Sequence, residues 1–123
     1  MSVTSFEAIA PVLNVNRRTM KPTIALFVDQ LGFELDTALG KHPSFAMLKK
    51  DGLTVMLACR PAIPWPHKGW AIYIWVDNID VLFIELSRRQ APIKGELRNR
   101  EYGVRELEVS LPDGRQVVFG QKL

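Results

Sequence analysis

Two glutamates near the C-terminal end of the sequence have the residue type and spacing for acid–base chemistry. Glu106 and Glu108 are separated by one residue, so both side chains point to the same face of an extended strand. Two carboxylates facing a cleft can divide the roles of general acid and general base. Ordinary cross-strand ion pairing is the favoured alternative, because arginines lie nearby in the sequence: Arg100, Arg105 and Arg115.

The other reactive side chains do not form a catalytic pattern. His42 precedes a predicted strand and His67 falls in a proline-rich stretch, without the i, i+4 spacing of a helical metal-binding pair. Cys59 is the single cysteine, so no intrachain disulfide can form, and its apolar surroundings favour an inert buried thiol. No glycine-rich phosphate loop precedes either predicted helix. These residues therefore give no support to nucleophilic catalysis.

Alternation along the predicted strands separates a core face from an open face. Side chains of one parity suit packing beneath helices: Leu13, Val15, Ile74, Val76, Val117 and Phe119. The opposite parity carries Ala10, Val12, Asn14, Met56, Ala58, Ala71, Tyr73, Trp75, Gln116 and Val118. This apolar and aromatic face, with a few polar groups, is typical of a pocket for a flat organic ligand. The alternative is that these side chains fill the interior or a dimer contact.

Hydrophobic periodicity and turn residues place the elements that position these side chains. A helix is predicted over 20–31, with Pro22 in its first turn and Gly32 as its C-terminal stop. A second helix begins at a cap formed by Asp77 or Asn78. Strands are expected near 8–15, 33–38, 44–49, 53–58, 70–76, 93–98, 103–110 and 115–120.

The order of these elements repeats along the chain. The strand ending at Val15 recurs 61 residues later as the strand ending at Val76. The hairpin residue Asp51 recurs 62 residues later as Asp113, so the register holds across the whole unit. The repeated unit reads βαβββ, which predicts an α+β protein built by internal duplication.

Length and composition limit the organisation and the partners. A chain of 123 residues with 47% apolar content can bury one core, so we expect one domain over 1–123. It would consist of modules at about 7–59 and 70–121 and a proline-rich linker at 60–69. Without a membrane-length apolar run or secretion signal, and with a lone cysteine, we expect a cytoplasmic protein without a membrane partner. The net charge is +3, but the basic residues are scattered, so no nucleic-acid partner is expected.

Four stretches carry a resemblance to known proteins: Pro11–Val15, Phe27–Phe33, Val76–Asp80 and Tyr102–Gly114. In these stretches the sequence resembles the vicinal oxygen chelate superfamily of glyoxalases, bleomycin-resistance proteins and dioxygenases, and within it the bleomycin-resistance proteins. The resemblance spans nearly the whole chain. It implies two tandem βαβββ modules whose eight strands form a curved, partly open sheet around a cleft, with the helices outside. It also implies a homodimer.

The resemblance indicates where a metal would be held. In the glyoxalase, dioxygenase and fosfomycin-resistance branches, His or Glu on the first and last strands of each module bind a divalent ion. The matching positions here are Ala10, Met56, Ala71 and Val118, which offer no imidazole, carboxylate or thiolate. We therefore expect no metal and no other cofactor.

The resemblance then implies binding without catalysis. The predicted function is metal-free sequestration of a flat aromatic molecule in a dimer cleft, giving resistance to an antibiotic or toxin. Because the chain is basic, with a pI near 9.2, we expect a neutral or anionic ligand. A metal-dependent lyase or dioxygenase of the same superfamily is the alternative. Phe45 and Tyr102 match places where bleomycin-resistance proteins have stacking aromatics, and the expected ligand-binding residues are Phe45, Met56, Tyr73, Trp75, Tyr102, Glu106, Glu108 and Val118.

Overall fold

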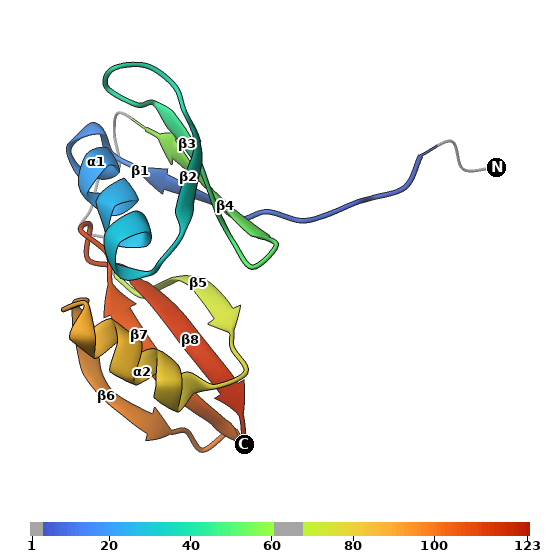
Figure 1. Cartoon of the computed structure of the whole chain (residues 1–123), viewed down its shortest axis with the longest axis vertical. Helices are drawn as coiled ribbons and strands as arrows, with labels where there is room; N and C mark the ends of the chain where they lie inside the picture. The colour runs from blue at the N-terminus through green and yellow to red at the C-terminus, as the bar shows by residue number, and fades with distance from the viewer. Residues whose placement is uncertain (1–3, 61–67) are drawn as a thin grey trace.

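The computed structural model shows two similar modules placed one above the other (Figure 1). It describes residues 4–60 and 68–123. The first module contains β1 (Val12–Val15), α1 (Arg17–Ala25), the π-helical turn η1 (Leu26–Gln30), β2 (Glu34–Ala38), β3 (Phe45–Lys50) and β4 (Leu53–Cys59). The second contains β5 (Trp70–Trp75), α2 (Ile79–Arg88), β6 (Ile93–Asn99), β7 (Val104–Ser110) and β8 (Gln116–Lys122). The predicted tandem βαβββ modules are confirmed.

Each module has one mixed sheet of four strands, and the strand order is the same in both. The orders are β1-β4-β3-β2 and β5-β8-β7-β6. In each sheet the first strand runs parallel to the last, and the other pairs are antiparallel. The eight strands therefore belong to two hydrogen-bonded sheets, whereas the resemblance implied one curved sheet. No strand ladder joins the two sheets within the described residues.

Residues 4–11 form an extended arm rather than the start of the first strand. The strand expected from residue 8 begins only at Val12, although the carbonyl oxygen of Pro11 still accepts a hydrogen bond from the Met56 N–H at 2.9 Å. In Figure 1 the arm projects away from both modules. Phe6 and Ile9 on this arm are 98% and 97% exposed, so the other described residues leave two large apolar side chains almost uncovered.

The first helix begins earlier than its apolar pattern predicts. Asn16 caps it, because the Asn16 Oδ1 atom accepts a hydrogen bond from the Thr19 N–H at 2.9 Å. Pro22 therefore lies inside the helix rather than in its first turn. The helix then widens into η1 and stops before Gly32, whose φ of +79° favours glycine. No helix among the described residues is long and apolar enough to cross a membrane.

The core lies between each sheet and its helix and continues from one module to the other. Phe27 and Phe33 meet edge to face, with ring centroids 5.1 Å apart. The predicted core parity is confirmed by four strand residues that are at most 5% exposed: Leu13, Val15, Val117 and Phe119. Ile74 and Val76 are partly buried against the same cluster.

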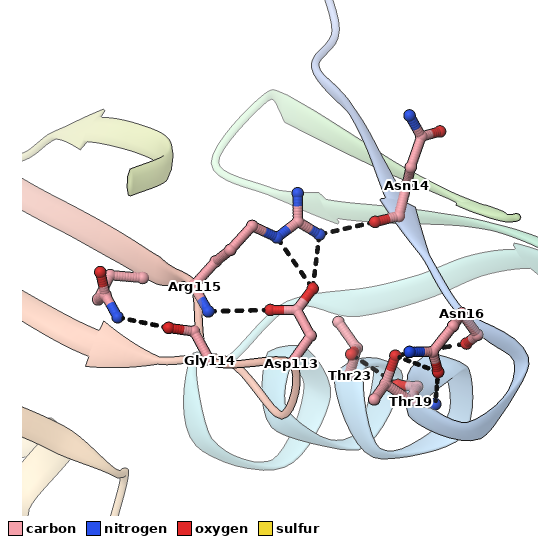
Figure 2. A network of polar contacts seen from close by, with 8 residues as sticks. Asn14, Asn16, Thr19, Thr23, Asp113, Gly114 and Arg115 are labelled. Carbon is pink, nitrogen blue, oxygen red and sulfur yellow. Dashed lines mark hydrogen bonds and ion pairs between the residues drawn. The ribbon is translucent and has the colours of Figure 1, made fainter. Parts of the chain in front are cut away.

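Polar contacts also join the modules. Figure 2 shows Arg115, in the turn between β7 and β8, donating a hydrogen bond to the backbone oxygen of Asn14 in β1, at 2.6 Å. Asp113 holds the same guanidinium through a hydrogen bond of 2.9 Å from Arg115 Nε to Asp113 Oδ2. The proline-rich segment expected to link the modules falls largely on residues 61–67, which lie outside the described residues, as does His67.

Candidate functional site

The open face of the second sheet carries three aromatic side chains in a row. The ring centroids of Trp70 and Tyr73 lie 5.5 Å apart, and those of Tyr73 and Trp75 lie 4.9 Å apart. The two indoles are about half exposed. Because side chains alternate along a strand, this face is opposite the one that carries Phe119 into the core. We call Trp70, Tyr73 and Trp75 the aromatic row.

Tyr73 can lie across β8 because Gly120 has no side chain. A Cβ atom at Gly120 would come within 2.0 Å of the Tyr73 hydroxyl and 2.6 Å of the ring carbon that bears it. Gly120 is not among the described glycines with positive φ, so its backbone does not require glycine. Its role is to leave space for the tyrosine ring.

Glu106 holds two tyrosines by their hydroxyls. The Tyr73 hydroxyl donates to Glu106 Oε2 at 2.7 Å, and the Tyr102 hydroxyl donates to Glu106 Oε1 at 2.6 Å. The Nε atom of Arg100 lies 3.2 Å from the same Oε1 and neutralises the carboxylate, which is only 3% exposed. With both oxygens engaged, Glu106 orients the tyrosine rings and is poorly placed to exchange protons with a ligand.

The network also fixes protonation states. Burial, together with the hydrogen bond to Glu106, raises the pKa of Tyr73 well above that of an ordinary tyrosine. The hydrogen bond to Tyr102 likewise raises the pKa of Arg100. Tyr73 therefore stays a neutral hydrogen-bond donor, and Arg100 stays a cation, at physiological pH.

The open face carries more basic than acidic side chains. The strand register places Lys94 opposite Glu108 and Arg98 opposite Glu106. The Lys122 Nζ atom lies 5.6 Å from the centroid of the Trp75 ring, within cation–π range. Glu108 has no hydrogen-bond or ion-pair partner within residues 4–60 and 68–123. The face thus combines aromatic surfaces, one unpaired carboxylate and several cations.

An apolar hollow of about 460 Å³ opens beside the aromatic row. Tyr73 and Trp75 form one wall, and the tip of β4 forms another. Its size falls in the usual range for small-molecule sites. The remaining wall residues are Ile9, Pro11, Phe33, Leu53, Thr54, Val55, Ile72 and Ile74.

The expected ligand-binding residues divide between the two sheets. The second sheet and the turn before β7 bring together six of them: Tyr73, Trp75, Tyr102, Glu106, Glu108 and Val118. Phe45 and Met56 lie on the open face of the first sheet, where Phe45 is opposite Ala58 and Met56 is opposite Met47. A ligand that contacts both groups of residues would have to touch both sheets.

Sequence reasoning missed Trp70 and misplaced Ala71. Strict alternation puts Ala71 on the open face with Tyr73, and Trp70 on the core face. The register of β5 shifts between Trp70 and Ile72, so Trp70 contacts Tyr73 while Ala71 packs against the core. Such a bulge depends on the pairing of two strands, and no residue in the sequence marks it.

Cross-strand pairing, the alternative expected for the glutamates, holds for Glu106. Among the arginines considered, Arg100 pairs with Glu106, whereas Arg105 pairs with Asp80 at 3.1 Å. Arg115 pairs with Asp113. Glu106 and Glu108 therefore differ, because the first is buried and neutralised and the second has no such partner within the described segments.

The positions that the resemblance assigns to a metal do not suit one. Ala10, Ala71 and Val118 have alkyl side chains, and Met56 has a thioether, so this set lacks the donors that bind Zn²⁺, Mn²⁺ or Fe²⁺. In the parts of the chain that the structure describes, no three His, Cys, Asp or Glu side chains gather as a possible ion site.

No family model matches the sequence, and no curated protein matches it. Several solved structures share the fold. A glyoxalase-related enzyme from Clostridium phytofermentans is 18% identical, with a TM-score of 0.77 and 100% of both chains covered. The antibiotic binding protein TnmS3 from Streptomyces sp. CB03234 is 19% identical, with a TM-score of 0.71, covering 98% of this chain and 100% of that one.

The bleomycin-binding protein of Streptomyces verticillus, solved with copper(II)-bleomycin, is 21% identical, with a TM-score of 0.71. The match covers 95% of this chain and 97% of that one. The chain therefore has the fold of the glyoxalase/bleomycin-resistance/dioxygenase proteins, as the resemblance in its sequence implied.

Proposed function

We propose that the chain sequesters a flat aromatic molecule on the open face of its second module, without a metal. The observation that carries this proposal is the aromatic row, held in place by Glu106 beside an apolar hollow. Exposed indoles flanking a fixed phenol provide stacking surfaces whose geometry is set before the ligand arrives. Binding alone lowers the concentration of free ligand, so protection from a toxic molecule requires no reaction.

Proteins of the same fold support an antibiotic as the ligand. TnmS3 is described as an antibiotic binding protein, and the Streptomyces verticillus protein binds bleomycin. The ligand of this chain would be neutral or anionic rather than strongly cationic. Lys94, Arg98 and Lys122 add positive charge to the open face, while Arg100 already neutralises Glu106.

Calorimetric titration with a planar aromatic anion, anthraquinone-2-sulfonate, tests the site. Trp75→Ala should weaken binding about twofold to twelvefold, because a stacking contact contributes roughly 0.5 to 1.5 kcal/mol beyond burial. Val81→Ala is the control, since Val81 is 57% exposed on α2 and lies outside both open faces. Val81→Ala should leave the affinity unchanged, and circular dichroism should show both variants folded.

Two results would overturn this assignment. One is an affinity for anthraquinone-2-sulfonate that Trp75→Ala and Val81→Ala leave equally unchanged. The other is tight binding of bleomycin that is indifferent to Trp75→Ala, which would contradict both the charge argument and the location of the site.

We further propose a twofold homodimer in which a second copy completes the cleft. The arm over 4–11 exposes Phe6 and Ile9 almost fully, and the expected residues Phe45 and Met56 lie on the other sheet from the aromatic row. A partner that covered the arm would bury its apolar side chains.

Light scattering at micromolar concentration should report a dimer. The double change Phe6→Ser and Ile9→Ser should shift it toward monomer, whereas Ile84→Ser, which alters a side chain 64% exposed on α2, should not. A monomeric parent protein would contradict the dimer.

Elemental analysis separates sequestration from the alternative metal-dependent lyase or dioxygenase. We expect no stoichiometric divalent ion in the dialysed protein, because the four positions Ala10, Met56, Ala71 and Val118 lack suitable donors. Stoichiometric zinc, iron, manganese or nickel that survives dialysis would favour the enzyme instead.

A further inference from the structure

A second hollow, in the first module, is lined by basic side chains. It has a volume of about 370 Å³ and shares no wall residue with the hollow beside the aromatic row. Its walls come from the start of α1 and from the loop between β2 and β3. We call it the basic hollow, and its lining is Arg17, Arg18, Met20, Lys21, His42 and Pro43.

The cations of the basic hollow have no partners within the described part of the chain. The side chains of Arg17, Arg18, Lys21 and His42 make no hydrogen bond or ion pair with any residue in 4–60 or 68–123. Arg60 and Arg98 likewise have no carboxylate partner within the described residues, whereas five other arginines do. A carboxylate lies within 3.2 Å of each of these: Arg88, Arg89, Arg100, Arg105 and Arg115.

The N-terminus of α2 is the equivalent place in the second module, and there an acidic side chain balances the basic one. Asn16 and Asn78 both cap a helix. Behind Asn78 the first turn of α2 contains Asp80, which pairs with Arg105. The first turn of α1 contains no acid and carries Arg17 and Arg18. Positive charge there is added to the positive end of the helix dipole, so the basic hollow is left with a charge imbalance that an anion would relieve.

We propose that the basic hollow binds a small phosphate-bearing molecule. A guanidinium group can donate two parallel hydrogen bonds to a phosphate group. Arg17 and Lys21 lie one helical turn apart on the same side of α1. Buried Met20 forms part of the floor. A hollow of about 370 Å³ suits a small molecule, whereas a nucleic acid would need basic side chains along an extended face. This site is independent of the aromatic row.

Calorimetric titration with inorganic pyrophosphate at low ionic strength tests the proposal. The double variant Arg17→Gln/Arg18→Gln should bind at least about tenfold more weakly, since it removes two charge-assisted contacts. Arg88→Gln/Arg89→Gln is the matched control, because it removes two neighbouring arginines at the end of the other helix. The control should retain the affinity of the parent protein, and circular dichroism should show both variants folded.

A separate titration shows that the two sites are distinct. Arg17→Gln/Arg18→Gln should bind anthraquinone-2-sulfonate as the parent protein does. The proposal is wrong if pyrophosphate produces no binding heat, or if the control variant loses as much affinity as the test variant. It is also wrong if a short DNA duplex binds through these arginines while pyrophosphate does not, because the surface would then serve a nucleic acid.

Discussion

Phe45 in the first sheet and Glu106 in the second occupy equivalent places. Phe45 lies opposite Ala58, and Glu106 lies opposite Gly120. The neighbouring equivalents differ as sharply, since Val12 corresponds to Tyr73, Asn14 to Trp75 and Met47 to Glu108. The first open face is mainly aliphatic with one aromatic ring, whereas the second is an aromatic row held by a buried carboxylate.

The core faces of the same strands have diverged much less in character. Leu13 corresponds to Ile74, Ala46 to Leu107 and Leu57 to Phe119, and all six are apolar. Burial beneath a helix allows changes of volume but penalises a polar side chain without a partner. The open faces lie on the side of each sheet away from its helix, where a buried polar group such as Glu106 could be accommodated once it gained partners. The proposed binding site lies on the second sheet, whose open face carries the aromatic row.

Among these predictions, Gly120→Ala should destabilise the protein most, because it disrupts the packing of the second open face. The new Cβ would overlap the Tyr73 ring and break its hydrogen bond to Glu106, so we expect the free energy of unfolding to fall by about 3 kcal/mol. Urea denaturation measures the change. The first sheet already accommodates a Cβ at the equivalent Ala58, because Val12 takes the place of Tyr73.

A double-mutant cycle isolates the clash. Gly120→Ala in a Tyr73→Ala background should cost less than about 1 kcal/mol, since the ring that it meets is gone. A cost equal to that in the parent background would show that Gly120 is required for some other reason. Ala58→Gly in the first sheet should cost only about 0.5 to 1 kcal/mol, from backbone entropy.

Glu106→Gln should have an intermediate effect, of about 2 kcal/mol. The amide loses the charge that strengthens the bonds from Tyr73, Tyr102 and Arg100. Glu108→Gln is the same change on the same face of the same strand, but Glu108 has no such partner among the described residues. It should alter the free energy of unfolding by less than about 0.5 kcal/mol. Equal effects of the two changes would contradict the structural difference between the glutamates.

The titration of Tyr73 should change the free energy of unfolding least among these predictions, and only at alkaline pH. Because the folded state raises the pKa of Tyr73 above its unfolded value, its stabilisation is fully present below about pH 10. It is lost as the pH rises through the folded-state pKa. The difference in unfolding free energy between the parent protein and Tyr73→Phe should therefore shrink above about pH 10.

Tyrosinate absorbance tests this pKa directly. The chain has two tyrosines, so Tyr102→Phe leaves Tyr73 as the single titrating phenol. Its absorbance should show little ionisation near pH 10, where a free tyrosine is half ionised. Half ionisation near pH 10 in the folded variant would contradict the raised pKa.

Most elements could be predicted because they depend on local patterns. Strand alternation and helical periodicity identified the two α-helices and eight strands of the described residues, and the repeated order predicted the tandem modules. The first helix was placed late, because its start depends on the Asn16 cap and not on apolar residues. The first strand was placed early, because residues 8–11 include apolar side chains, whereas pairing with β4 among the described residues starts only at Val12, apart from the bond to the Pro11 carbonyl oxygen.

The candidate site was only partly predictable. Period-two alternation identified the open face, including Tyr73 and Trp75, because those residues lie beyond the irregular start of β5. It failed at Trp70 and Ala71, where the register shift exchanges the two faces. The role of Gly120 was also hidden, because it depends on a tyrosine ring from another strand.

The sequence by itself determined the duplicated α+β architecture and the parity of the core, since both follow from residue spacing along single strands and helices. Only the tertiary structure decided the partners of the charged groups. Glu106 pairs with Arg100 and accepts hydrogen bonds from two tyrosines, and Arg105 pairs with Asp80. The cations of the basic hollow have no carboxylate partner within the described residues. Such partnerships depend on distances of a few ångströms between segments far apart in the chain, which periodicity does not specify.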